Sequence, residues 1–83
     1  MNDIAGYRQY FQNGTFIIDY PGGAKWIGGA YEILEHGEGI KYFPDGATYE
    51  GEMAFGRYHG TGRYTWPNGD VYEGQWLRGN RHG

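Results

Sequence analysis

YEGEMAFGRYHGTGRYTWPNGDV, residues 49–71, decides the fold, because the chain restarts the same pattern immediately with YEGQWLRGNRHG, residues 72–83. A shift of 23 residues places like residues on one another through most of the sequence. All three Pro and all three His of the chain follow this period. So regular a period identifies internal repeats. The recurring residues are Pro21, Pro44 and Pro67; His36, His59 and His82; Gly23, Gly46 and Gly69; and Gly28, Gly51 and Gly74.

The period divides the chain into units. Two are complete, at 26–48 and 49–71, and a partial third covers 72–83. Residues 1–25 keep only the closing half of a unit, so we expect an N-terminal cap followed by a degenerate repeat. For residues 1–13 in particular we expect a cap and not a regular hairpin arm.

Within a unit, the alternation of side chains indicates β-strands. Tyr49, Gly51 and Met53 would lie on one face of an extended strand, and Glu50 and Glu52 on the other. This period of two, in segments rich in Tyr, Thr and Trp, is typical of strands. PDG at 44–46 and PNG at 67–69 predict tight turns, because Pro presets φ and Gly accepts a positive φ.

Each unit therefore reads as strand, loop, strand and tight turn. The predicted fold is all-β: an elongated antiparallel meander of repeated 23-residue β-hairpins without helices of note. We expect strands near 15–20, 25–30, 38–43, 48–53, 61–66 and 70–76.

Glycines stand between the aromatic residues of these strands. A strand glycine leaves room for an aromatic ring to lie across it, which stabilises a sheet. We expect the rings to form the core, with some left partly open as a groove. Truncating Trp66 or Tyr72 to Ala should then cost about 3–5 kcal/mol, the usual range for a buried aromatic residue. Glu50→Gln or Glu52→Gln should change little.

Composition narrows the function. The 83 residues include no Cys and no Ser, which excludes disulfides and thiol or serine nucleophiles. The net charge is −3, because residues 1–56 are acidic and residues 57–83 are slightly basic. The overall acidity argues against a nucleic-acid partner. The sequence has neither a signal-peptide pattern nor a long apolar run, so we expect a cytoplasmic protein.

The chemically suggestive side chains have simpler interpretations. Histidines one repeat apart would lie on alternate strands about 10 Å apart, too far for a shared metal, so we assign them to the hairpin loops. The strand glutamates have no accompanying nucleophile. We therefore predict no catalytic, cofactor or metal site. Candidate anion contacts remain at Arg57, Arg78 and Arg81.

The pattern resembles a known family. The segment 72–76, Y-E-G-Q-W, and the segment 59–69, H-G-T-G-R-Y-T-W-P-N-G, are similar to the MORN (membrane occupation and recognition nexus) repeat. The unit at 26–48 departs from it, with Trp26 in place of Tyr and Ile33 where the loop glycine is expected. The resemblance implies an elongated twisted antiparallel sheet and a scaffold role in cytoskeletal, ciliary or membrane-associated assemblies.

Three functions remain open. The first is a non-catalytic scaffold for protein–protein interactions. The second is a peripheral module that makes weak contact with anionic phospholipid, and the third is the regulatory MORN segment of a larger enzyme. For the scaffold, the predicted partner-binding residues on the aromatic face and open edge are Trp26, Tyr49, Met53, Tyr64, Trp66, Tyr72 and Trp76.

The partial unit at 72–83 predicts a first strand without its return strand. Such an edge offers unpaired backbone groups that template strand addition. We expect either a longer array, of which this chain is a fragment, or a partner at this edge. Self-association through the same edge is a third possibility.

Overall fold

The computed structural model describes residues 2–4, 7–31 and 34–82, and the side chains of residues 7–31 and 34–80. Every regular element in these ranges is a strand, and the strands form one antiparallel sheet in sequence order. The predicted all-β meander is confirmed. The strands are β1 (Asn2–Ile4), β2 (Tyr7–Gln12), β3 (Thr15–Asp19), β4 (Lys25–Tyr31), β5 (Leu34–Tyr42), β6 (Thr48–Ala54), β7 (Arg57–Thr65), β8 (Val71–Leu77) and β9 (Asn80–His82).

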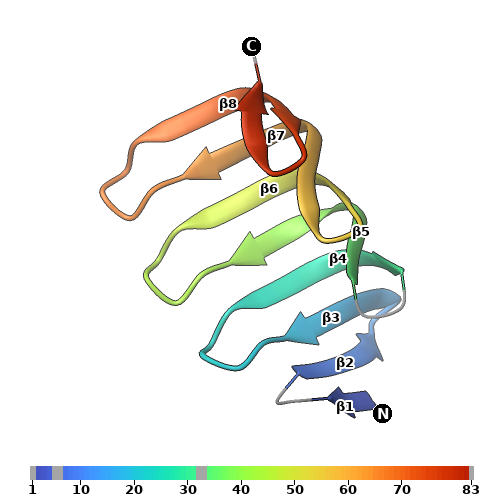
Figure 1. Ribbon diagram of the computed structural model, residues 1–83. Helices are drawn as coiled ribbons and strands as arrows, with labels where there is room; N and C mark the ends of the chain where they lie inside the picture. The colour runs from blue at the N-terminus through green and yellow to red at the C-terminus, as the bar shows by residue number, and fades with distance from the viewer. Residues whose placement is uncertain (1, 5–6, 32–33, 83) are drawn as a thin grey trace.

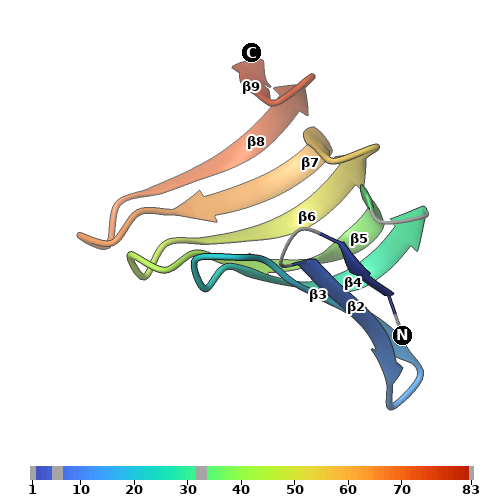
Figure 2. The same cartoon turned by 60° about the horizontal axis from the view of Figure 1, so that its bottom comes forward.

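The molecule is a stack of hairpins, with extents of 38 × 24 × 24 Å. The termini lie at opposite ends of the stack, with long connections on one side and tight turns on the other (Figure 1). The strands are curved and the sheet is twisted (Figure 2). Because the sheet is a single layer, one face must supply the core by itself.

The long connections are the predicted Pro turns. In the last of them, Trp66 N donates to Asp70 O at 2.8 Å and Gly69 N donates to Trp66 O at 2.9 Å. Gly69 has φ +97°, the left-handed backbone that favours glycine. Asp70 N also donates to Asn68 Oδ1 at 2.9 Å, so the Asn side chain reinforces the turn. The same pair of backbone bonds closes the turns at 20–24 and 43–47.

The tight turns lie at the other ends of the hairpins. Phe55 and Gly56 have φ +49° and +85°, and Arg78 and Gly79 have φ +53° and +88°. Two successive positive φ values define a type I′ turn, whose twist matches that of its strands. Because these connections are so short, β5 and β7 begin at Leu34 and Arg57, earlier than the predicted 38 and 61.

A bulge explains how β7 continues through its glycines. Gly51 pairs with Gly62, but the next residue, Glu52, pairs with His59, so Gly60 and Thr61 are extra on β7. Gly60 takes φ +64° at this bulge, and Gly37 takes φ +87° at the matching place in β5. The assignment of the histidines to hairpin loops was therefore wrong: His36 and His59 lie within strands, each just before a bulge glycine.

The N-terminal segment corrects a second expectation. We predicted a cap and no regular hairpin arm over residues 1–13, yet β2 pairs with β3 over five residue pairs. Asn13 and Gly14, with φ +53° and +79°, form the type I′ turn between them. Asn-Gly is a strong hairpin signal at this position, and it outweighs the loss of the repeat pattern.

The C-terminal edge of the sheet also differs from the expectation. The predicted missing return strand is present in part as β9, which pairs with Gln75–Leu77 of β8. The turn Arg78–Gly79 allows this reversal. The edge that the sequence left open is thus covered along its C-terminal part.

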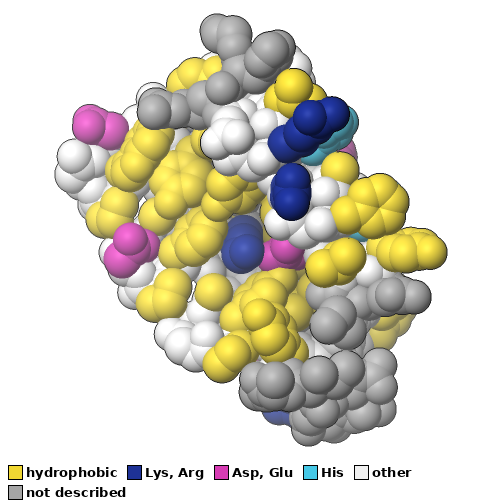
Figure 3. Space-filling view, in the orientation of Figure 1, with side chains coloured by type: hydrophobic (Ala, Val, Ile, Leu, Met, Phe, Trp, Pro, Cys, Tyr) yellow, Lys and Arg dark blue, Asp and Glu magenta, His cyan; other side chains and the backbone are white. Residues whose placement is uncertain are grey.

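The core lies on one face of the sheet, here called the aromatic face. Its buried cluster consists of Ile18, Trp26, Tyr49, Met53 and Trp76. Hydrophobic side chains gather across the middle of the face seen in Figure 3, with charged side chains among them. The other face is acidic: Glu38, Glu50, Glu52 and Glu73 lie around Arg63.

Candidate interaction surface

The aromatic face is built from rings that lie on glycines. A Cβ placed on Gly39 would be 2.5 Å from Cζ2 of Trp26, and one on Gly62 would be 2.5 Å from Cζ of Tyr49. Each ring therefore occupies the space that any other residue at the glycine would need. In both cases the glycine lies 13 residues after the ring, on the next strand. The expectation that rings lie across strand glycines is confirmed.

The polar end of each ring is anchored in the same way. Trp26 Nε1 donates to Gly29 O at 2.7 Å, and Tyr49 OH donates to Glu52 O at 2.7 Å. Tyr72 OH donates to Gln75 O at 3.2 Å. The acceptor always lies three residues ahead on the same strand. Indole and phenol can both serve at this position because each carries a donor at its far end.

Trp76 joins the rings of the C-terminal half. Its ring meets Tyr49 at 5.6 Å, Tyr58 at 5.0 Å and Tyr72 at 5.3 Å between centroids, in edge-to-face geometry. Trp76 Nε1 donates to Gly62 O at 3.1 Å. Tyr58 in turn stacks on Tyr49 at 4.3 Å. Edge-to-face pairs add about 0.5–1.5 kcal/mol each beyond burial, so this cluster is a major source of stability.

The predicted partner-binding residues fall into two groups. Four are buried, with exposed fractions of 0% to 6%: Trp26, Tyr49, Met53 and Trp76. Tyr64, Trp66 and Tyr72 are half-buried. The buried group holds the sheet together, whereas a partner could reach the half-buried group without unfolding it.

A buried ion pair, which sequence reasoning missed, lies among the rings. Lys41 Nζ is 2.8 Å from Glu35 Oε2, and the Glu35 side chain is only 5% exposed. Tyr20 OH donates a short hydrogen bond to the same carboxylate oxygen. Lys41 Nζ also lies 4.8 Å from the centroid of the Tyr20 ring and 5.5 Å from that of Phe43.

The repeat itself carried a signal for this pair. Glu35 and Lys41 occupy the positions that Tyr58 and Tyr64 hold one period later. In the later unit these two positions make an edge-to-face ring contact at 6.1 Å. In the earlier unit a salt bridge replaces this ring contact. The replacement of two aromatic residues by two oppositely charged residues is visible in the sequence.

Burial holds the phenols of this face in their neutral form. It raises the pKa of Tyr49 to about 12, with a smaller effect of the nearby Glu52 charge. Burial, and then the hydrogen bond to Glu35, raise the pKa of Tyr20 well above its ordinary value. Burial also raises the pKa of Tyr58, with the neighbouring Tyr64 as the next cause.

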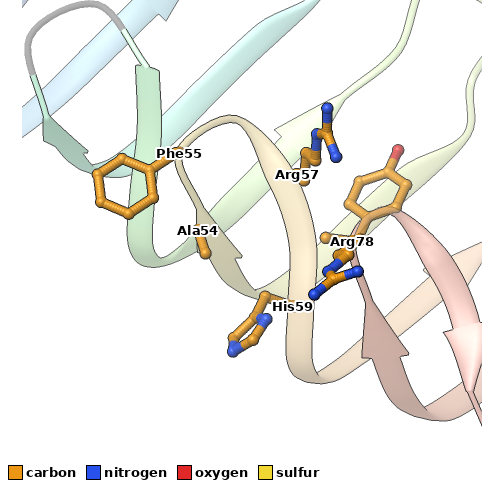
Figure 4. A pocket seen from close by; sticks show the side chains of 6 residues that line it. Ala54, Phe55, Arg57, His59 and Arg78 are labelled. Atoms are coloured by element: carbon orange, nitrogen blue, oxygen red, sulfur yellow. The ribbon is translucent and has the colours of Figure 1, made fainter.

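Two of the three predicted anion contacts come together at the tight turns. Arg57 and Arg78 line one pocket of about 390 Å³ with Ala54, Phe55, Tyr58 and His59 (Figure 4). The side chain of Arg81 lies outside the described residues.

Two further findings concern the described residues. They contain no group of three or more His, Asp or Glu side chains placed to hold a metal ion. They also contain no helix long and apolar enough to cross a membrane.

Comparison with known proteins gives the family. The family model of the MORN repeat matches residues 33–48, 49–71 and 72–83, which together cover more than half of the chain. No curated protein matches the chain. The matched boundaries at 49 and 72 coincide with the repeat boundaries found from the period of 23, and the chain belongs to the MORN-repeat family.

Proposed function

We propose that this MORN-repeat protein is a non-catalytic scaffold that binds another protein through the half-buried part of its aromatic face. The observation that carries the proposal is the row of Tyr64, Trp66 and Tyr72, which are half-buried beside the buried Tyr49 and Trp76. Aromatic side chains that combine apolar area with a polar end are typical anchors of protein interfaces.

The arrangement of the anchors favours a pre-organised surface. The Tyr64 and Trp66 rings lie 4.8 Å apart, and Tyr64 also contacts Phe43 and Trp76 at 5.8 and 6.2 Å. Rings that are already held by their neighbours lose little conformational entropy on binding. MORN repeats generally take part in protein–protein or membrane interactions, which agrees with a surface of this kind.

Several features support a role without catalysis. The sequence lacks Ser and Cys, and on the aromatic face Glu35 and Lys41 are engaged with each other. A reacting site needs a nucleophile or a titratable group within reach of a substrate. We propose that the scaffold works in a larger cytoplasmic assembly.

The experiment uses the full chain with a photo-crosslinking amino acid at Trp66 or, as the control, at Tyr42. Tyr42 is 43% exposed and lies next to Lys41 on the strand, so its side chain faces away from the aromatic face. Crosslinking in native cells should give a specific adduct from position 66 that is absent from position 42. The adduct's protein should then bind the purified chain, and Trp66→Ala should weaken that binding at least about tenfold.

Other outcomes would reject the scaffold. Equal adducts from both positions, or unchanged affinity of Trp66→Ala, would mean that the aromatic face is not the interface. Adducts formed only between copies of the chain would indicate self-association. Strong, salt-sensitive binding to phosphatidylserine vesicles without any protein adduct would replace the scaffold with a lipid-binding module.

A further inference from the structure

We propose that the pocket between the turns 55–56 and 78–79 binds a carboxylate of an acidic, partly apolar segment of a protein partner. This inference rests on the proposed scaffold function and adds the chemical nature of the partner. The pocket lies at the tight-turn ends of the hairpins, so binding there can be tested separately from binding at the half-buried rings.

The pocket is formed by two hairpins one repeat apart. Phe55 stands in the tight turn between β6 and β7, Arg57 is the first residue of β7, and Arg78 stands in the tight turn between β8 and β9. Figure 4 shows the arginines on neighbouring hairpins, with Phe55 and His59 on the side away from Arg78's hairpin. Gly79 N donates to Tyr58 O of β7 at 3.0 Å, which holds the second turn against the strand that follows the first turn.

The two arginines differ from the described lysines. Lys25 and Lys41 each form a salt bridge, with Asp19 and Glu35 respectively. Neither Arg57 nor Arg78 forms a salt bridge within the part of the chain that the structure describes. A guanidinium group offers a rigid fork of donors that matches a carboxylate, so two of them beside one pocket make a site for such a group.

The backbone supplies a second, independent observation. Arg78 occupies the first position of a type I′ turn at φ +53°, where the left-handed backbone disfavours most residues and Asn is preferred. The β2–β3 hairpin of the same sheet has Asn13 at this position, with the same φ. Arg78 is therefore a poorer choice for the turn than Asn, so the geometry of the turn does not account for an arginine at this position.

Phe55 is likewise an unusual residue for the first position of a type I′ turn, and it provides the apolar wall of the pocket. It also sits at a positive φ of +49°, and it is 58% exposed. Its ring packs on His36 at 4.6 Å and on Tyr31 at 5.6 Å, so it is held in place although it is open to solvent. A fixed exposed ring beside two guanidinium groups suits a segment in which acidic and apolar side chains alternate.

The charge of the protein favours a carboxylate ligand over an anionic membrane surface. Each basic residue near an anionic membrane contributes only about 1 kcal/mol, and the chain as a whole carries −3. Two arginines on such a protein give weak attraction to a lipid surface. Paired directly with carboxylates in a pocket, the same groups form charge-assisted hydrogen bonds, which are stronger.

The test is a nuclear magnetic resonance titration of the full chain with an acetylated and amidated peptide, Glu-Leu-Glu-Phe-Glu. The expected result is saturable shifts of the Phe55, Arg57 and Arg78 signals, and none with the peptide in which Gln replaces each Glu. The double variant Arg57→Gln with Arg78→Gln should bind at least about tenfold more weakly. The control double variant, Arg8→Gln with Arg63→Gln, has the same net charge and should bind normally.

A single variant separates binding from folding. Arg78→Asn should raise the melting temperature by about 2–6 °C, because Asn accepts the left-handed turn, while it weakens peptide binding. A protein that becomes more stable and binds less cannot have lost binding through unfolding.

Three results would overturn the inference: no saturable shift at the pocket, equal weakening by the control double variant, or binding to phosphatidylserine vesicles that depends on the two arginines while the peptide does not bind. The peptide titration needs no native partner. It can therefore fail while crosslinking at Trp66 succeeds, or succeed while that crosslinking fails.

Discussion

The ring of Tyr49 occupies the place of the side chain that Gly62 lacks, with Cζ of the ring 2.5 Å from where a Cβ at Gly62 would stand. The ring spans from its own strand, β6, to the paired strand β7, and its hydroxyl closes on Glu52 O at 2.7 Å. Trp26 and Gly39 repeat the relationship one unit earlier. Each of the two complete units is thus held together by one ring and one glycine on adjacent strands.

Gly62→Ala should destabilise the protein by about 3 kcal/mol, because the added methyl group displaces a fully buried ring. The control is Gly46→Ala, where a Cβ meets nothing within 4 Å and only the positive φ opposes it. That variant should cost about 1 kcal/mol. Urea denaturation of both variants measures the difference. Equal losses would mean that the Tyr49 ring is not held by this glycine.

Truncation of the aromatic residues should follow their burial. Tyr49→Ala and Trp26→Ala should each cost about 3–5 kcal/mol, enough to unfold so small a sheet. The sequence led us to expect this loss for Trp66 and Tyr72, but both are half-buried, so the loss at these two should be smaller. Glu50→Gln, on the exposed acidic face, should stay within about 0.5 kcal/mol of the wild type. Thermal melts that reversed this order would contradict the assignment of the faces.

The Glu35–Lys41 pair should show strong coupling. Lys41→Met leaves the buried Glu35 carboxylate with Tyr20 as its one remaining side-chain partner among the described residues, and should cost about 3 kcal/mol. The double variant Glu35→Tyr with Lys41→Tyr recreates the ring contact that Tyr58 and Tyr64 make. It should be more stable than either single Tyr variant. Additive losses in the double-mutant cycle would mean that the pair and the rings are not equivalent.

Stability should fall at high pH. The pKa of Tyr49 is raised from its ordinary 10.0 to about 12, so the folded state holds this proton more tightly than the unfolded chain does. The resulting stability is fully present below pH 10 and is lost as the pH rises from 10 toward 12. Phenolate absorbance, with Tyr49→Phe to assign the signal, measures the titration. If all nine tyrosines titrated together near their ordinary pKa, the phenol of Tyr49 would not be buried as described.

The sequence predicted the repeated hairpins, their faces and their Pro turns because each depends on local chemistry. Alternation placed Tyr49 and Met53 on the buried side, and Pro with Gly fixed the long connections. Ring–glycine packing also followed from spacing, because a glycine between aromatic residues has few other uses in a strand. These features lie within one or two strands, where the pattern of residues determines the geometry.

What the sequence did not predict depends on register between strands. The bulge at Gly60 shifts the pairing with β6, which extends β7 back to Arg57 and shortens the loop to two residues. Without it, HGTG reads as a loop. The pocket could not be predicted for the same reason: it depends on strand pairing. Arg57 and Arg78 come together only because two tight turns align at one end of the sheet. The Glu35–Lys41 pair was missed because the repeat was read for its similarities and not for its exceptions.

The central claim, that the half-buried rings of the aromatic face form the interface, is tested most directly by calorimetric titration with the partner identified by crosslinking. The comparison is between Trp66→Ala and Tyr42→Ala, two aromatic truncations on opposite faces. We predict that Trp66→Ala weakens the affinity at least about tenfold while Tyr42→Ala leaves it within about twofold of the wild type. An affinity that Trp66→Ala leaves unchanged in a folded protein would contradict the account.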